Sequence, residues 1–476
     1  MSLASSLRST RTMRGIAAAA VVLATGGLIL ARASLAAPRG SMAASEPPAT
    51  GTDNLARFYG PGAHGQVALS HAKVLAGNGS LFAEVRITAD EGAGAFEPAP
   101  LALVLVLDTS GSMEGEKIDR AKDSVLALMH DMRDDDEVAL VRYSSEAEVV
   151  QPLARMSAVR RSLVARVRGL EAGGGTNIPS GLSMGLKTLA EAEPGRVRRV
   201  VLVSDGLDST RAEAERLASD NAERGVTISS MGIGLDFDEA YMSSVARAGH
   251  GNFSFVNDGA ALAAFLHREL DEASKTTVEN ATVRLTLPRD VRFVRASGVD
   301  AHLEGGSVVL KMGSLFAGDE RRGLLQLSTS IPAGEARDIA VDATWHAVGG
   351  KDADLHAIAV GVSATGDERE VQRGEDEAVM TSWTSVTSSQ RELEAAQAYA
   401  HGDKATANAL IDQNIDTLSN RLAVAPPRAA AALKSQIASY AAQRKTFEVA
   451  PSSDEGKRAA KSATVKETSN LVRTAY

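Results

Sequence analysis

The spacing of apolar residues changes along the chain and divides it into segments. Between about Leu101 and Glu272, short apolar runs alternate with stretches in which apolar residues recur every three or four positions. The apolar runs predict six strands, at Leu101–Leu107, Glu137–Tyr143, Val149–Leu153, Arg198–Ser204, Val226–Gly232 and Gly251–Val256. Because strands that alternate with helices form parallel sheets, we expect an α/β domain with a doubly wound, mostly parallel sheet over residues 99–273.

On either side of this segment the apolar residues alternate with polar ones instead. Gln66–Val74 and Leu81–Thr88 alternate around a glycine-rich turn, which predicts a β-hairpin within residues 61–98. After Lys275 the period of two returns, and residues 274–368 are expected to form a β-sandwich. Two arrangements fit this pattern. Either the hairpin completes the sandwich and the α/β domain is inserted in it, or the sandwich simply follows the α/β domain.

The C-terminal part is rich in Ala, Glu and Gln and predicts an α-helical region over residues 369–450. Its helical periodicity lies at Trp383–Ala400, Lys404–Leu422 and Arg428–Lys445. This region would either cap the sandwich or offer a peptide-binding groove. Residues 451–476 are highly charged and are expected to be a flexible tail.

The N-terminus has the composition of an export signal. Arg8, Arg11 and Arg14 precede an uncharged run, Gly15–Ala31, and small residues follow up to Ala36. Residues 1–36 therefore predict a signal peptide, followed by a linker over residues 37–60 and a mature protein in the periplasm or outside the cell. The alternative is an uncleaved N-terminal membrane anchor. The chain contains no cysteine, which excludes a lipoprotein anchor and disulfides.

Composition narrows the class of partner. The 476 residues include 44% hydrophobic and 23% charged residues, as in folded soluble proteins. The formal net charge is −9, which argues against binding to nucleic acid or to anionic lipid.

Oxygen-bearing side chains follow two of the predicted strands and one glycine-rich turn. Asp108, Ser110 and Ser112 come directly after the first strand, Thr176 follows Gly173–Gly175, and Asp205 follows the fourth strand. Carboxylate and hydroxyl oxygens suit hard divalent cations such as Mg²⁺. Ligands of open α/β sheets bind beyond the carboxyl ends of the strands, which is where Asp108 and Asp205 fall. The alternative is a polar turn at Ser110–Ser112 and a helix cap at Asp205.

The order and spacing of these five residues resemble the metal-ion-dependent adhesion site of von Willebrand factor type A (VWA) domains, over about Leu101–Glu272. The resemblance implies that Ser110, Ser112 and Thr176 offer hydroxyls to Mg²⁺ (or Mn²⁺ or Ca²⁺), and that Asp108 and Asp205 bind it directly or through water. It also implies that an Asp or Glu of a protein partner completes the coordination. The chain around the domain resembles bacterial members of the family and, more loosely, the inter-alpha-trypsin inhibitor heavy chains.

No motif of an enzyme competes with this interpretation. Gly181, Gly185, Lys187 and Thr188 lack the spacing of a phosphate-binding loop, and close helix packing explains the two glycines more simply. The histidines form no HExxH motif. We therefore expect an exported, metal-dependent adhesion module that is not an enzyme. Two alternatives remain: an envelope scaffold with a structural metal, and an accessory subunit of a separately encoded ATPase.

Overall fold

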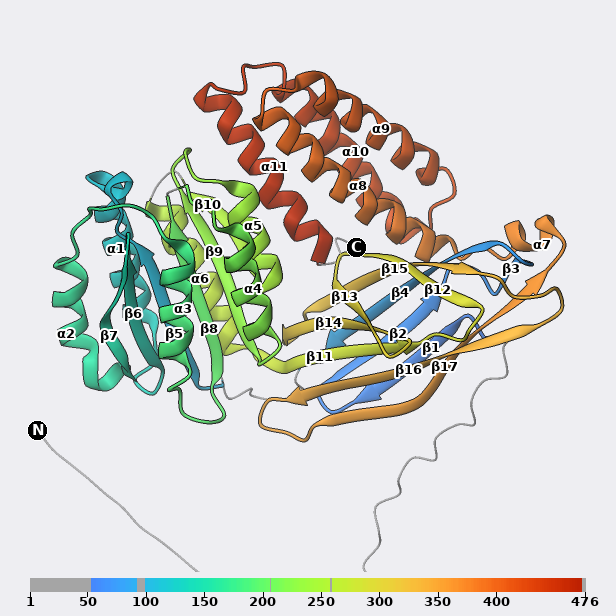
Figure 1. Ribbon diagram of the computed structural model, residues 1–476, viewed down its shortest axis with the longest axis horizontal. Helices are drawn as coiled ribbons and strands as arrows, with labels where there is room; N and C mark the ends of the chain where they lie inside the picture. The colour runs from blue at the N-terminus through green and yellow to red at the C-terminus, as the bar shows by residue number, and fades with distance from the viewer. Residues whose placement is uncertain (1–52, 92–98, 206, 257–258, 473–476) are drawn as a thin grey trace, which may run out of the picture. The chain divides into compact units, whose positions relative to one another are not determined.

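The computed structural model describes residues 53–91, 99–205, 207–256 and 259–472 (Figure 1). These residues fall in one compact unit, Pro47–Tyr476. No helix in the described ranges is long and apolar enough to cross a membrane. The predicted signal or anchor, and the linker up to residue 52, lie outside the described residues.

The α/β domain is built on a six-stranded sheet in the order β10-β9-β8-β5-β6-β7. The strands are β5 (Leu101–Asp108), β6 (Glu137–Tyr143), β7 (Ala147–Arg155), β8 (Val197–Ser204), β9 (Val226–Ile233) and β10 (His250–Val256). Every neighbouring pair is parallel except β6 and β7. The predicted fold class, a doubly wound and mostly parallel sheet, is confirmed.

Helices cover both faces of this sheet (Figure 1). Leu103, Leu105 and other alternate residues of β5 pack against α1 (Glu116–Asp131), α2 (Met156–Arg168) and α6 (Gly259–Ser274). The intervening residues pack against α3 (Ile178–Leu189), α4 (Arg211–Ala222) and α5 (Glu239–Ala248). A strand buried on both faces is apolar at nearly every position, which explains the continuous run in the sequence.

Two further sheets form the β-sandwich. The first has the order β1-β2-β4-β15-β12 and the second the order β13-β14-β11-β16-β17-β3. Their strands are β1 (Leu55–Gly60), β2 (Ala63–Leu69), β3 (Lys73–Leu75), β4 (Gly79–Ala89), β11 (Thr276–Thr286), β12 (Val291–Ser297), β13 (Asp300–Glu304), β14 (Ser307–Phe316), β15 (Glu320–Thr329), β16 (Ala336–Ala347) and β17 (Ala353–Thr365). Strand β4 pairs with β15 along its length, so the α/β domain is inserted into the sandwich.

Two boundaries in the N-terminal part of the sandwich differ from the predictions. The linker expected over residues 37–60 ends earlier, because Leu55–Gly60 pairs with β2 as strand β1 and buries Ala56 and Phe58. The first predicted hairpin strand, Gln66–Val74, is divided. Its first part belongs to β2, whereas Lys73–Leu75 crosses to the other sheet and pairs in parallel with β17. Both segments are too short for their periodicity to reveal the partner strand.

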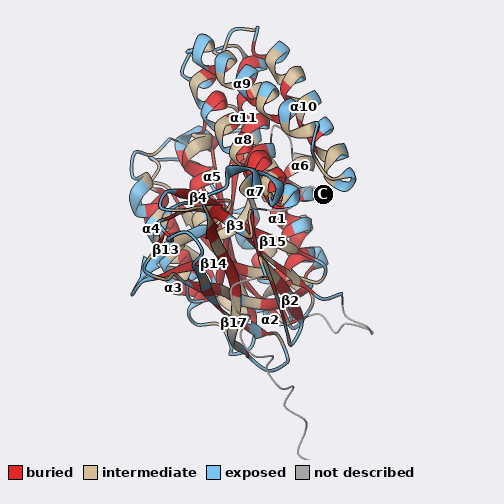
Figure 2. Ribbon diagram, turned by 90° about the vertical axis from the view of Figure 1, so that its right-hand side faces the viewer, coloured by how far each residue is buried: buried red, intermediate tan, exposed pale blue. Residues whose placement is uncertain are grey.

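The helical region contains α7 (Glu368–Arg373), α8 (Glu377–Ala400), α9 (Lys404–Leu422), α10 (Pro427–Thr446) and α11 (Asp454–Val472). The flexible tail predicted over residues 451–476 is wrong for most of its length, because α11 occupies it. Ala460, Ala463 and Leu471 are buried on one face of this helix. The charged residues that suggested a flexible tail lie largely on its other faces or form ion pairs. Figure 2 shows the same division in α9 and α10, which have buried and exposed sides.

Candidate metal centre

Parallel pairing brings two buried aspartates to one edge of the α/β sheet. Strands β5 and β8 are neighbours, with Leu107 opposite Val203, so the residues that follow both strands emerge side by side. Asp108 is 0% exposed and Asp205 is 1% exposed. Burial of two like charges is costly unless hydrogen bonds or cations compensate them. The surroundings of these two carboxylates therefore decide what this edge can bind.

Hydroxyl and amide groups connect the two carboxylates. The Ser110 amide donates to Asp108 Oδ1 at 2.8 Å, and the Ser204 hydroxyl donates to Asp108 Oδ2 at 2.7 Å. The Ser110 and Ser112 hydroxyl oxygens lie 3.0 Å apart, and Ser112 Oγ donates to Asp205 Oδ1 at 2.8 Å. Four of the five predicted site residues thus form one continuous hydrogen-bond network. Ser204, which orients Asp108, was not predicted, although it directly precedes Asp205 in the sequence.

Thr176 stands on a loop that backbone hydrogen bonds hold against this network. The Gly173 amide donates to the Thr109 carbonyl at 2.7 Å, and the Gly111 amide donates to the Gly174 carbonyl at 3.0 Å. Gly174 has φ +86°, a conformation that favours glycine. Thr176 itself is half-buried. Among the described residues, no hydrogen bond joins its side chain to the other four, so the structure places it beside the network and outside it.

Lys117, which the sequence analysis did not single out, reaches the same carboxylate. Its ammonium group forms an ion pair with Asp205 Oδ2 and donates to the Ser112 carbonyl at 3.1 Å. The lysine side chain is 32% exposed, whereas the Asp205 side chain is 0% exposed. In the first turn of α1 a lysine is usually solvated, so its position in the sequence gave no sign of this contact. Lys117 supplies one positive charge to an edge that carries two carboxylates.

Electrostatics favour a cation at this edge. Burial raises the pKa of Asp108, the hydrogen bonds from Ser110 and Ser204 oppose that rise, and the nearby charge of Asp205 adds to it. In the described part of the chain, no three His, Cys, Asp or Glu side chains form a cluster that could hold a metal. A metal here would therefore depend on hydroxyl ligands. All the candidate ligand atoms are oxygens. Oxygen ligands suit a hard cation such as Mg²⁺ and are a poor match for soft metals, which prefer sulfur.

The glycines of α3 serve helix packing, as predicted. A Cβ at Gly181 would lie 2.6 Å from the Tyr143 ring, and a Cβ at Gly185 would lie 2.4 Å from Val106 Cγ2. Real Cβ atoms do not approach so closely, so α3 packs against β5 and β6 only because these positions lack side chains. Asn177, at the N-terminus of α3, accepts a hydrogen bond from the Ser180 amide at 3.0 Å and so caps the helix directly after Thr176.

Comparison with known proteins identifies the domain that carries this site. Residues 102–268 match the family described as von Willebrand factor type A domain. A solved structure, a von Willebrand factor type A protein from Catenulispora acidiphila, superposes with a TM-score of 0.66 over 90% of this chain and 98% of that one, at 17% identity. At that identity the likeness shows the fold alone.

Two curated relatives match part of the chain. An uncharacterised protein of Synechocystis sp. is 24% identical over 48% of this chain and 57% of its own length. The inter-alpha-trypsin inhibitor heavy chain H4 of Bos taurus is 28% identical over 31% of this chain and 17% of its own length. The chain thus spans little more than half of the first relative and under a fifth of the second.

Proposed function

Because residues 102–268 form a von Willebrand factor type A domain, we propose that the chain is an exported protein-binding module whose adhesion depends on a divalent metal. The observation that carries the proposal is the pair of buried carboxylates, Asp108 and Asp205, linked through serine hydroxyls at one edge of the sheet. Mg²⁺ would be held by Asp108, Ser110, Ser112, Thr176 and Asp205, with Mn²⁺ or Ca²⁺ as substitutes. When bound, the ion supplies a positive charge that attracts a carboxylate of the partner.

The residues of the site divide into two groups by whether their side chains belong to the hydrogen-bond network. Asp108, Ser110 and Ser112 follow β5 in a turn that their own hydrogen bonds fix, so they form the permanent part of the site. Thr176 lies on a glycine-rich loop that backbone hydrogen bonds join to that turn, but among the described residues its own side chain forms no hydrogen bond to the turn. We therefore assign the permanent residues to retention of the ion, and Thr176 to its presentation to the partner.

An incoming Asp or Glu is the ligand that the charges at this edge favour. Two carboxylates only neutralise a divalent ion, and Lys117 adds a further positive charge beside Asp205. With the ion bound, the edge therefore carries an excess of positive charge, so a third carboxylate is attracted in a partly dehydrated setting. The export signal predicted at residues 1–36 would place this surface in the periplasm or outside the cell.

Metal binding is tested on the mature full-length chain with Mn²⁺ as a direct probe. Electron paramagnetic resonance measures free Mn²⁺, so its loss on addition of protein reports the bound fraction. Wild type should bind one strong equivalent, and Asp108→Asn should abolish that binding because a fixed buried ligand loses its charge. Asp119→Asn removes an exposed carboxylate from α1 and is the matched control. Equal Mn²⁺ binding by wild type and Asp108→Asn would refute the assignment.

Adhesion is tested separately, through Thr176. Thr176→Ala should keep Mn²⁺ bound but lose EDTA-sensitive capture of the partner from an envelope extract, whereas Thr176→Ser, which keeps the hydroxyl, should retain capture. One observation favours a second candidate function, a scaffold with a structural metal: Lys117 already compensates part of the negative charge. If Thr176→Ala captures the partner as well as wild type does, the scaffold function is the better description.

A further inference from the structure

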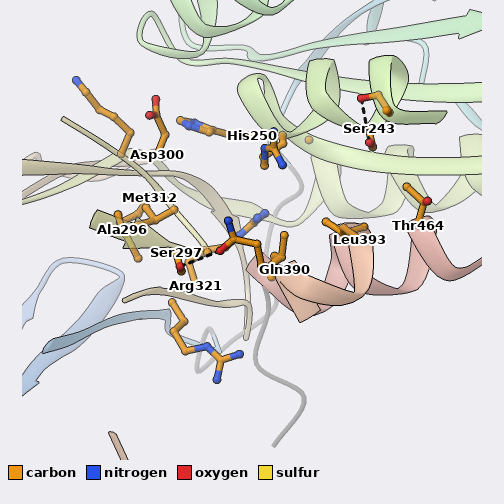
Figure 3. A pocket seen from close by; sticks show the side chains of 18 of the residues that line it. Ser243, His250, Ala296, Ser297, Asp300, Met312, Arg321, Gln390, Leu393 and Thr464 are labelled. Carbon is orange, nitrogen blue, oxygen red and sulfur yellow. Dashed lines mark hydrogen bonds between the residues drawn. The ribbon is translucent and has the colours of Figure 1, made fainter. Parts of the chain in front are cut away.

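A second site is suggested by a cavity of about 360 Å³ at the junction of the three parts of the chain (Figure 3). Its walls come from α4, α5 and β10 of the α/β domain, from β12, β13, β14 and β15 of the sandwich, and from α8 and α11 of the helical region. None of the five predicted metal ligands, and not Lys117, lines it. A volume of this size falls within the range of small-molecule sites.

The cavity has the opposite charge to the chain as a whole. Five of its lining side chains are basic, namely Arg211, Arg247, Lys311, Arg321 and Arg322, and two are acidic, Asp300 and Glu394. The whole sequence instead contains 60 acidic and 51 basic residues. A local excess of positive charge in an acidic protein raises the local concentration of anions.

Two of the basic side chains, those of Arg247 and Lys311, form no ion pair among the described residues, although the charges of Glu215 and Asp300 act on Arg247 from a greater distance. Arg211 pairs with Glu215 at 2.7 Å and Arg321 pairs with Asp319 at 3.0 Å, so their charges are already compensated. The side chains of Arg247 and Lys311 form neither an ion pair nor a hydrogen bond with any described residue, and only their backbone groups are bonded. Asp300 stands opposite Lys311 in the β13–β14 ladder without forming an ion pair. The guanidinium group of Arg247 and the ammonium group of Lys311 are therefore available to a ligand.

His250 adds a polar atom that lacks a partner. It begins β10 with φ 54°, and its Nε2 is buried without a hydrogen-bond partner among the described residues. Burial, together with the positive charges of Arg321 and Lys311, lowers the pKa of His250 to about 4, so the imidazole is neutral at pH 7. Figure 3 shows His250 on the same side of the cavity as Asp300 and across from Gln390. A buried nitrogen of this kind is normally satisfied by a ligand or by water.

The remaining walls are partly apolar and partly neutral. Met312, Leu393 and Leu471 contribute apolar surface. The Ser297 hydroxyl, on β12 of the sandwich, donates to Gln390 Oε1, on α8, at 3.1 Å. A bare inorganic ion would leave this surface in contact with water. The combination suits a ligand with a charged end and an uncharged body.

We propose that this cavity binds a small organic oxyanion, carrying a phosphate or carboxylate group that Arg247 and Lys311 engage and a compact body that rests against Met312 and Leu393. Charge-assisted hydrogen bonds to the oxyanion are stronger than neutral ones, and arginine suits their planar geometry. Because the walls belong to three parts of the chain, the bound ligand would also hold those parts together.

The test is calorimetric titration of the mature full-length chain in EDTA, so that its outcome is independent of the metal site. The probes are phenyl phosphate, succinate and inorganic phosphate. Wild type should bind phenyl phosphate or succinate with saturation and inorganic phosphate more weakly. Preference for phenyl phosphate assigns a phosphate ligand, and preference for succinate assigns a carboxylate ligand.

Substitution of the two available cations locates the binding. Arg247→Met and Lys311→Met should each weaken the preferred probe by at least about tenfold, as expected for loss of a charged hydrogen bond. Arg292→Met removes an exposed cation of β12 outside the cavity and should leave binding unchanged. Circular dichroism verifies folding, and either cavity variant suffices if the other does not fold. Failure of all probes to saturate wild type, or unchanged binding by a folded cavity variant, would overturn the proposal.

Discussion

Replacement of Lys117 by methionine tests whether the two buried carboxylates of the site need a nearby positive charge for stability. The substitution keeps most of the apolar stem and removes only the ammonium group that pairs with Asp205. Breaking a fully buried ion pair costs about 3–5 kcal/mol, because the remaining charge has no partner. Lys117 is 32% exposed, so solvent screens part of this loss. We therefore expect the metal-free domain to lose about 1–3 kcal/mol of stability.

Mg²⁺ should restore much of that loss. A bound divalent ion compensates both buried carboxylates, so the stabilisation that Lys117 provides matters less once the ion is present. The unfolding midpoint of Lys117→Met should therefore rise more on addition of Mg²⁺ than that of wild type. For a domain of this size each 1 kcal/mol corresponds to roughly 2–4 °C, which makes the difference measurable.

Differential scanning calorimetry is the suitable assay. Trp345 and Trp383 are the only tryptophans in the sequence, and both lie outside the α/β domain, so fluorescence would report the wrong part of the chain. Lys122→Met is the control, because Lys122 is on the same helix and pairs at 3.7 Å with the exposed Asp119. It should change stability by less than about 1 kcal/mol. Equal destabilisation of Lys117→Met with and without Mg²⁺ would contradict this reasoning. It would mean that the lysine and the metal do not compensate the same carboxylate charge.

Three further predictions concern packing, pH and processing. Gly185→Ala should destabilise the α/β domain by about 1–3 kcal/mol in calorimetry, because the clash with Val106 exceeds the gain in helix propensity, whereas Ser183→Ala on the exposed side of α3 should be neutral or stabilising. Burial raises the pKa of Glu392 to about 8, above its unfolded value of 4.5, so the native state binds more protons between these values and stability should fall as pH rises from about 4.5 to 8. Glu392→Gln should flatten that dependence in urea titrations, and an unchanged slope would contradict it. N-terminal sequencing should find the mature protein beginning near Ala37, whereas an intact Met1 in a membrane fraction would establish the anchor.

The α/β domain could be predicted from sequence because its signals are local. A strand buried on both faces gives an uninterrupted apolar run, so Leu101–Leu107 could be located without a structure. Parallel strands end at a common edge, so the positions of Asp108 and Asp205 after two such runs placed them together. The motif supplied the remaining ligand candidates, and the structure brings all but Thr176 into one hydrogen-bond network.

Other features depend on contacts between distant parts of the chain and leave little local trace. Helix α11 is stabilised by pairs such as Lys461 with Glu239 at 2.7 Å, and from sequence alone such lysines indicate a solvated tail. Strand β1 has only two buried alternating residues and depends on β2 for its hydrogen bonds. The cavity is lined by cations from separate elements, so no stretch of sequence contains its charge pattern.

The insertion of the α/β domain has a consequence for proteolysis of the chain. The domain leaves the sandwich after β4 and returns through Lys275, which alone separates α6 from β11. A single cut in either connection leaves the domain attached through the other, and the partner strands β4 and β15 remain paired. Release of the α/β domain therefore requires two cleavages, and one of the two targets is a single residue between a helix and a strand. A domain joined to the rest of the chain by a single connection would be released by one cleavage.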